Sequence, residues 1–396
     1  MSTTFSLSNR RYILSSSEEV KPLIESVNVE TVTSFSIDGN SIGADAAVAL
    51  RELLLRMPGL QSANFSNIFS RPQKEEIPDT LATICDGLKG MTTLMDLDLS
   101  DNAIGAIAVG SLVPFLVENR SLRVLKINNV GFGPEAGTIV AKALHLSALL
   151  HSIHKQRSNL RAIICGQSRL ENGSATAWSD AFACHTNLVA VHMSHNDIGE
   201  IGLTAIARGL ENCRSLRYLN IADNAVRQES LDATRTDPDV DAATAFASAL
   251  ASWKDLEYLG LSDCCLGVSA TSQIIDALSK GNNLKLRALL LDNASFDESF
   301  GIKLLGALNQ ALPNLVTLKL ADHEGLDNTE DGVIMAKIDR IITSRPEGML
   351  VLERDIEDVE DTVYLDSVLA EVITLPAAAA SNDLIEAMAG MSVSDS

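Results

Sequence analysis

Basic residues are scarce in this sequence. Thirty-one lysines and arginines stand against 52 aspartates and glutamates, which gives a formal charge of −21. A chain this acidic is poorly suited to a nucleic-acid backbone or an anionic membrane surface, and it suits a basic protein partner better. We therefore expect no nucleic-acid partner and no membrane partner.

Long apolar runs are missing as well. The longest uncharged apolar stretch covers residues 103–117, which is shorter than the ~20 residues that a membrane-spanning helix needs. No sustained apolar segment begins the chain, so we expect no secretory signal. The six cysteines form no C-x-x-C pair, and together these features favour reduced thiols in the cytosol or nucleus.

Motifs that build an active site are also absent. The chain contains no G-x-x-x-x-G-K-[ST], no G-x-S-x-G and no H-E-x-x-H,. His151 and His154 lack acidic or cysteine companions nearby, and His192 and His195 straddle a strand end, where alternate residues point in different directions,. We therefore expect no metal site, no cofactor and no self-contained active site, so the chain is not expected to be an enzyme itself.

A repeat dominates what the sequence does contain. LMDLDLSDNAIG (residues 94–105) fits the pattern L-x-x-L-x-L-x-x-N-x-I-G. The other copies begin at Val32, Leu60, Leu122, Leu160, Leu188, Leu216, Leu256, Leu286 and Leu315. Four of the nine successive spacings are 28 residues, so chance is not a serious competitor. The sequence predicts a leucine-rich repeat array of about ten copies.

Each copy has room for one strand and one helix. The L-x-L core predicts a short strand, the following Asn turns the chain, and the residues after Gly43 and Ile198 show the spacing of an amphipathic helix,. The predicted fold is an α/β horseshoe with a parallel sheet on the concave side and helices on the convex side. Cys264 at the Asn position and Cys165 at an inward strand position are expected to be packing residues.

Three regions are expected. Residues 1–31 form an amino-terminal cap, and residues 32–345 form the repeat domain, which a helix over residues 332–344 closes. Residues 346–396 contain twelve acids and one base, which predicts an acidic and largely flexible tail.

One column of residues indicates an interaction surface. The position just before the repeat Asn holds Gly39, Asn67, Asp101, Asn129, Gln167, His195, Asp223, Asp263, Asn293 and Asp322. The column contains no Lys or Arg, and it should line one edge of the sheet. Exposed turn positions are often polar in any protein, but ten repeats without a base favour a basic partner at this edge.

Two segments go beyond the generic repeat. ANFSNIFSRPQKEEIPDTL (residues 63–81) and LRAIICGQSRLENGSATAW (residues 160–178) resemble signatures of the Ran GTPase-activating proteins, and the third and fourth repeats resemble that family in order and spacing. The similarity covers roughly residues 30–345. It implies an activator that binds a Ran-type small GTPase in its GTP-bound form, with or without a Ran-binding protein. Such an activator orders the catalytic machinery of Ran and inserts no arginine finger.

The resemblance also implies roles for single residues. Asn129 matches a family asparagine near the nucleotide, Arg169 matches the arginine of R-L-E-N, and Arg71 lies one position before Pro72, on which a further family arginine falls. We expect these three residues to act in catalysis. The expected partner-binding residues are Asn67, Asp101, Asn128, Asp223, Asp263 and Asn293. A monomer in the cytoplasm or at the nuclear periphery would fit this role.

Two other functions are also compatible with the repeat pattern. A binding module of the ribonuclease-inhibitor type would have the same horseshoe and would occlude a basic partner without accelerating a reaction. The sensor portion of a nucleotide-binding receptor is a weaker alternative, because the chain lacks a phosphate-binding loop. The R-L-E-N-G segment favours the activator.

Overall fold

Ten parallel strands confirm the predicted repeats. The computed structural model describes residues 3–25, 27–70, 74–224, 241–322, 331–352 and 359–374. Each predicted copy supplies one short strand. The repeat strands are β3 (Val32–Ser36), β5 (Ser62–Asn64), β6 (Asp96–Asp98), β7 (Val124–Lys126), β8 (Ala162–Ile164), β9 (Ala190–His192), β10 (Tyr218–Asn220), β11 (Tyr258–Gly260), β12 (Ala288–Leu290) and β13 (Thr317–Lys319).

Two further strands extend this sheet at its ends. β1 (Thr3–Ser6) pairs with β3 inside the predicted amino-terminal cap, and β14 (Met349–Val351) pairs with β13. The result is a 12-stranded sheet whose strands follow chain order. A small second sheet joins β2 (Ile13–Leu14) to β4 (Ser41–Ile42). From β5 to β14 equivalent residues of successive repeats pair directly, so any repeat position forms a row across the sheet.

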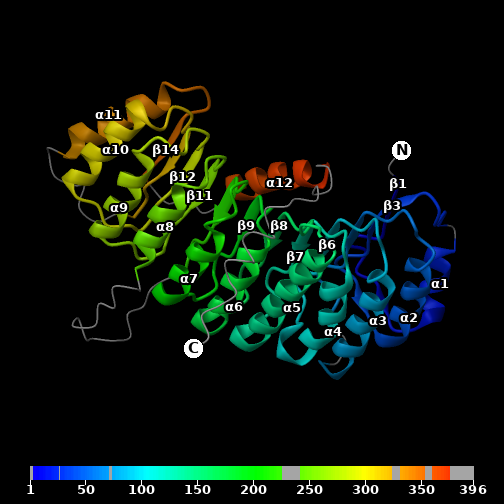
Figure 1. Ribbon diagram of the computed structural model, residues 1–396. Coiled ribbons are helices and arrows are strands. Elements are labelled where there is room, and N and C mark those ends of the chain that lie inside the picture. The colour runs from blue at the N-terminus through cyan, green and yellow to red at the C-terminus, as the bar shows by residue number, and fades with distance from the viewer. Residues whose placement is uncertain are drawn as a thin grey trace, which may run out of the picture.

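Helices cover one side of the sheet (Figure 1). After α1 (Ser17–Ile24), they are α2 (Ala44–Leu54), α3 (Ile77–Leu88), α4 (Gly105–Glu118), α5 (Gly133–Ile153), α6 (Glu171–Cys184), α7 (Glu200–Leu210), α8 (Ala242–Leu250), α9 (Val268–Leu278), α10 (Glu298–Gln310) and α11 (Asp331–Thr343). A single 3₁₀ turn (Lys74–Glu76) precedes α3. In α2, Ala46, Leu50 and Leu53 form the buried stripe that the sequence pattern predicts,. Strand and helix side chains together make one continuous apolar core along the array.

Helix α5 is the longest of the outer helices, with 21 residues, and is apolar over most of its length. By length and composition it could cross a membrane, and half of its most apolar 18-residue window is buried. It packs between α4 and α6 in the outer layer. A repeat helix with neighbours on both flanks has this character without any membrane.

Buried asparagines turn the chain after the strands. The Asn102 side chain donates hydrogen bonds to the carbonyl oxygens of Phe65 and Leu99, both at 2.9 Å. The equivalent residues in other repeats, Asn40, Asn196 and Asn224, are buried in the same way. Cys264 replaces this residue in the eighth repeat, and its thiol contacts the carbonyl oxygen of Ile221 at 3.2 Å. Burial raises the pKa of Cys165 and of Cys264 to about 12, so both expected packing roles are confirmed.

The carboxyl-terminal region differs from the prediction. The closing helix expected over residues 332–344 is α11, but the expectation of a largely flexible tail from residue 346 does not hold for two segments. β14 continues the sheet, and α12 (Val359–Thr374) lies on the side of the sheet opposite the outer helices (Figure 1). Residues 375–396 lie outside the described part of the chain.

Candidate functional site

The predicted column forms a row at the strand-end edge of the sheet, which we call the rim. Every member adopts a left-handed backbone, with φ between +51° and +59° for the nine non-glycine residues and +68° for Gly39. Asn, Asp and Gly tolerate this conformation best, so the turn itself accounts for much of the polar composition. Gln167 occupies the same conformation without that preference. The absence of bases therefore has a backbone cause as well as the proposed electrostatic one.

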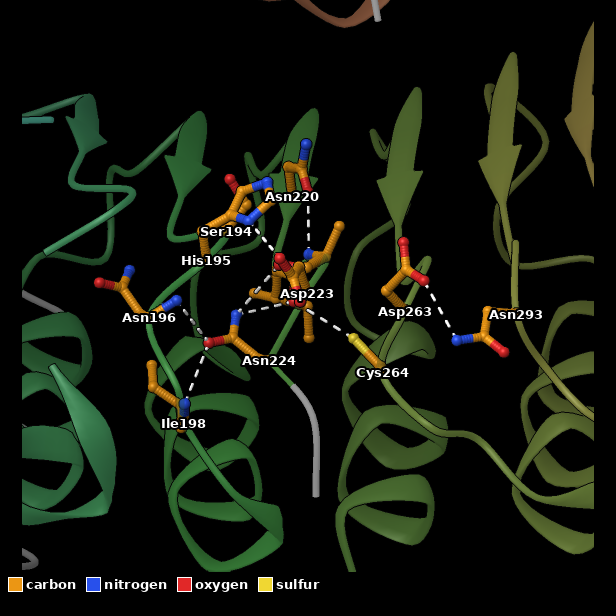
Figure 2. A network of polar contacts seen from close by, with 12 residues as sticks. Ser194, His195, Asn196, Ile198, Asn220, Asp223, Asn224, Asp263, Cys264 and Asn293 are labelled. Carbon is orange, nitrogen blue, oxygen red and sulfur yellow. Dashed lines mark hydrogen bonds and ion pairs between the residues drawn. The ribbon is translucent and has the colours of Figure 1, made fainter. Parts of the chain in front are cut away.

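Neighbouring rim side chains contact one another across repeats. The amide nitrogen of Asn129 donates to Asp101 at 3.0 Å, and that of Asn293 donates to Asp263 at 3.2 Å. His195 Nδ1 forms an ion pair with Asp223. Figure 2 shows the last two of these pairs along the carboxyl ends of the strands. The rim is thus a polar edge on which three pairs of side chains orient one another across neighbouring repeats,.

Asn129 is exposed, whereas its predicted companion Asn128 is half-buried. The hydrogen bond to Asp101 directs the Asn129 Nδ2 group along the rim and leaves its carbonyl oxygen turned away from that contact,. Asn128 Oδ1 accepts from the backbone N–H of Gly166 at 2.5 Å. The structure therefore gives Asn128 a role in joining the fourth and fifth repeats, while Asn129 points outward.

The fifth repeat carries unusual backbone strain beside the rim. Arg169 and Glu171 are exposed and adopt φ of +53° and +50°. In the fourth repeat, the equivalent positions are Gly131 and Gly133, both with φ of +65°. A left-handed backbone costs a residue with a Cβ roughly 1–2 kcal/mol. Asp197 and Cys265 adopt the same conformation at the position equivalent to Arg169. The R-L-E-N segment therefore differs from these repeats in placing a long cationic side chain there, and left-handed residues concentrate at functional sites.

The remaining predicted residues are scattered along the rim. Asn67 is exposed next to Asp101, and Asp223, Asp263 and Asn293 lie several repeats further on. The structure brings Asp101, Asn129 and Arg169 into adjacent repeats and separates them from the last three. Arg71 and Pro72 lie outside the described residues, so the placement of that arginine stays a prediction.

The histidines have ordinary structural surroundings. Burial lowers the pKa of His192 to about 4, and its ring contacts the Ser194 hydroxyl at 2.9 Å. His151 is buried against the carbonyl oxygen of Ser147 at 2.8 Å. Within the described ranges, no group of three metal-binding side chains occurs.

A second surface, the concave face of the middle strands, was not predicted from the sequence. Its side chains form an apolar patch: Val124, Ala162, Ile164, Ala190, Tyr218, Tyr258, Ala288 and Leu290. Four basic residues precede these strands: Arg123, Arg161, Arg217 and Arg287. The recurring Leu-Arg pair at the start of these repeats was a signal that could have found them. Helix α12 covers this patch.

A cavity of about 600 Å³ lies beside α12. Arg217, Glu257, Arg287 and Lys319 contribute its charged lining. It opens on the strand-start side of the carboxyl-terminal repeats and includes none of the predicted rim residues. The polar rim and this cavity are therefore separate features.

Comparisons with known proteins agree with the repeat and with the resemblance. A family model described as "Leucine Rich repeat" matches residues 90–113 and 184–207. Ran GTPase-activating protein 1 of Saccharomyces cerevisiae is 28% identical over 340 residues, which cover 83% of this chain and 80% of the yeast protein. Ran GTPase-activating protein 1 of Xenopus laevis is 35% identical over 189 residues, 47% of this chain and 33% of the frog protein.

The competing horseshoe family matches more weakly. Ribonuclease inhibitor of Mus musculus is 23% identical over 270 residues, 63% of this chain and 53% of the mouse protein. This chain spans most of the yeast relative but about a third of the frog relative. The chain therefore has a leucine-rich repeat fold, and its sequence is similar to Ran GTPase-activating proteins.

Proposed function

We propose that this chain is a GTPase-activating protein for a Ran-type small GTPase. It binds the GTP-bound form through the rim and accelerates hydrolysis by ordering the catalytic groups of the GTPase. The names of its relatives support this activity, and the horseshoe supplies the surface. The chain contributes no active site of its own and requires no cofactor.

The observation that carries the proposal is the arrangement of Asp101, Asn129 and Arg169 in three successive repeats. All three are exposed on the same edge in a left-handed backbone. Asn129 has its amide orientation set by Asp101 at 3.0 Å. Arg169 keeps a costly backbone conformation where the previous repeat uses glycine. A polar group held in place before the partner arrives is suited to stabilising a transition state.

The chemistry to be accelerated is phosphoryl transfer to water. Small GTPases position the attacking water with their own side chain, commonly a glutamine, and hydrolysis is slow when that group is disordered. The Asn129 amide can donate to and accept from a neighbouring amide, and would hold it in line for attack. The Arg169 guanidinium would fix a carboxylate or backbone carbonyls of the partner through its planar set of donors.

The rest of the rim serves recognition. Asp101, Asp223 and Asp263 give it negative charge, which favours encounter with a basic GTPase. We propose that Asn67 and Asn293 add polar contacts at the two ends. A monomer in the cytoplasm or at the nuclear periphery, with or without an assisting Ran-binding protein, completes the proposal.

Single-turnover hydrolysis of GTP on Ran, with catalytic amounts of this chain, tests the proposal. Multiple Ran molecules should be converted for each molecule of activator. Binding without acceleration would refute the activator and support the ribonuclease-inhibitor type of occluding module. Absence of binding would refute the activator and leave an occluding module for a different basic partner.

A further inference from the structure

Helix α12 lies on a surface prepared for it. Leu365, Val368, Leu369 and Val372 follow the i, i+3, i+4, i+7 spacing of one helix face and are at most 8% exposed,. They pack on the apolar patch of strands β7–β12. Val363, on another face of the same helix, is 64% exposed. The helix is thus amphipathic, and its apolar stripe matches the apolar patch.

The repeats do not need this contact to form their core. The side chains between strands and outer helices make one apolar cluster, and α12 with the concave patch makes a second, separate cluster. The concave face of the amino-terminal strands is polar at equivalent positions, for example Ser62 in β5 and Asp98 in β6. An apolar concave face is therefore confined to the strands that α12 crosses.

Polar contacts fix the direction of the helix. Arg123, just before β7, donates to the carbonyl oxygen of Ile373 at 2.7 Å, in the last turn of α12. At the other end, the Tyr364 hydroxyl donates to Glu257, just before β11, at 3.0 Å. A guanidinium at the carboxyl end of a helix stabilises its negative dipole end. The carboxyl end of α12 therefore lies over β7 and its beginning lies near β11.

The basic residues that precede the strands favour an acidic helix on this face. Residues 359–374 contain four acids and no Lys or Arg. Arg217 donates to Glu371 at 2.5 Å and also to Glu257 at 2.7 Å. Arg123 and Arg161 precede the neighbouring strands β7 and β8, and an acidic helix offsets the repulsion between two such cations,.

We propose that the concave face of β7–β12 is a binding site for acidic amphipathic helices, and that α12 occupies it in cis. A partner helix with apolar side chains at i, i+3, i+4 and i+7 and with acidic flanks would enter only when α12 is released. The contacts of α12 involve strands and the residues that precede them, whereas the rim lies at the strand ends. The site is therefore a second interaction surface, separate from the one proposed for the GTPase.

The test uses full-length variants and a labelled synthetic peptide of residues 359–374. The double substitution Val368→Asp and Leu369→Asp removes two buried contacts of α12. Val363→Asp is the control for an added carboxylate, because it replaces an apolar side chain by Asp on an exposed face of the same helix. Hydrogen exchange reports on residues 362–374 and on the repeat helices, and fluorescence anisotropy reports peptide binding.

The double variant should exchange about 100-fold faster over residues 362–374, with unchanged protection of α4–α7. The peptide should bind this variant and should bind neither the natural chain nor Val363→Asp. Glu371→Arg, whose site is exposed, should raise the exchange roughly 5-fold, because it replaces the contact with Arg217 by a repulsion between two cations,.

Three results would overturn the proposal. They are rapid exchange of residues 362–374 in the natural chain, failure of the peptide to bind the folded double variant, and loss of protection in the repeat helices together with α12. If the double variant does not fold, unchanged exchange of residues 362–374 in the folded Glu371→Arg chain overturns the proposal. Neither readout uses GTP hydrolysis, so the result is independent of the proposed activator function.

Discussion

The rim and the concave face belong to the same strands but are built in opposite ways. The rim consists of polar side chains that project from left-handed turns. Contacts with the neighbouring repeat orient some of these side chains, as in the Asn129–Asp101 pair. The concave face of β7–β12 is apolar and is covered by a helix more than a hundred residues away from some of its contacts, such as Arg123. A local repeat generates the first surface, whereas only the folded chain generates the second.

The largest expected effect follows removal of the Asn129 amide from the rim. Asn129→Gly should lower activation of GTP hydrolysis by about 100-fold, since one positioned polar group is often worth that much. Glycine adopts φ near +51° without cost,, and the lost hydrogen bond is exposed. The free energy of unfolding should therefore change by no more than about 1 kcal/mol. Single-turnover hydrolysis and chemical denaturation check both statements.

Arg169→Gly should separate function from stability at the rim. The substitution gives the fifth repeat the residue type that the fourth uses at Gly131, so the free energy of unfolding should stay equal or rise,. Activation should fall by about 10-fold, because a charged donor to the partner is lost. Glu171→Gly is the control: it relieves the same kind of strain in the same loop and should keep activation. Equal activity of both variants would contradict the role of Arg169.

Asp101 should act by orienting Asn129. Asp101→Gly removes the acceptor and should lower activation roughly 5-fold, a loss comparable to one neutral hydrogen bond. Asp101→Asn retains a side-chain oxygen at that position and should restore most of the activity. If both substitutions lower activation equally, the charge of Asp101 matters to the partner and not its contact with Asn129.

The smallest effect concerns pH on the concave face. The Arg217 guanidinium lowers the pKa of Glu371. The contact is therefore fully present above the ordinary glutamate pKa of about 4.3 and is lost as the pH falls through the lowered value in the folded chain. Glu371→Gln should exchange roughly 3-fold faster than the natural chain over residues 362–374 at pH 6. The two should come to exchange alike as the pH falls through the lowered pKa of Glu371, and a ratio that does not change with pH would contradict this contribution.

Most of the fold could be predicted because each repeat is a local unit. The L-x-L core and the Asn that follows it set a strand and a turn within a dozen residues, and all ten strands lie at the predicted copies. The closing helix was expected over residues 332–344 and spans Asp331–Thr343. The amino-terminal cap contains a strand, β1, which pairs with β3 in the structure.

The carboxyl-terminal region could not be predicted from its composition. The acidity of residues 346–396 suggested a solvated tail, but acids are compatible with order when they face a basic row. The spacing of Leu365, Val368, Leu369 and Val372 is a local signal of an amphipathic helix, which the composition of the region does not show. Its place on the sheet depends on Tyr218, Arg217 and other distant residues, which no local pattern connects to it.

The candidate site was predicted in part. The rim column could be found from the repeat, and the structure supplies its physical cause, the left-handed turn. The strain at Arg169 and the contact between Asp101 and Asn129 needed coordinates, because both depend on backbone angles and on pairing between repeats. Asn128, expected to bind the partner, instead joins two repeats through Gly166.

The central claim is that the rim and its Asn129 amide accelerate hydrolysis on the partner. It is tested most directly by single-turnover GTP hydrolysis on Ran with catalytic amounts of the natural chain and of Asn129→Gly. The account predicts rapid hydrolysis with the natural chain and about 100-fold less activation with the equally stable variant. Equal activation by both chains, or no activation by the natural chain, would contradict it.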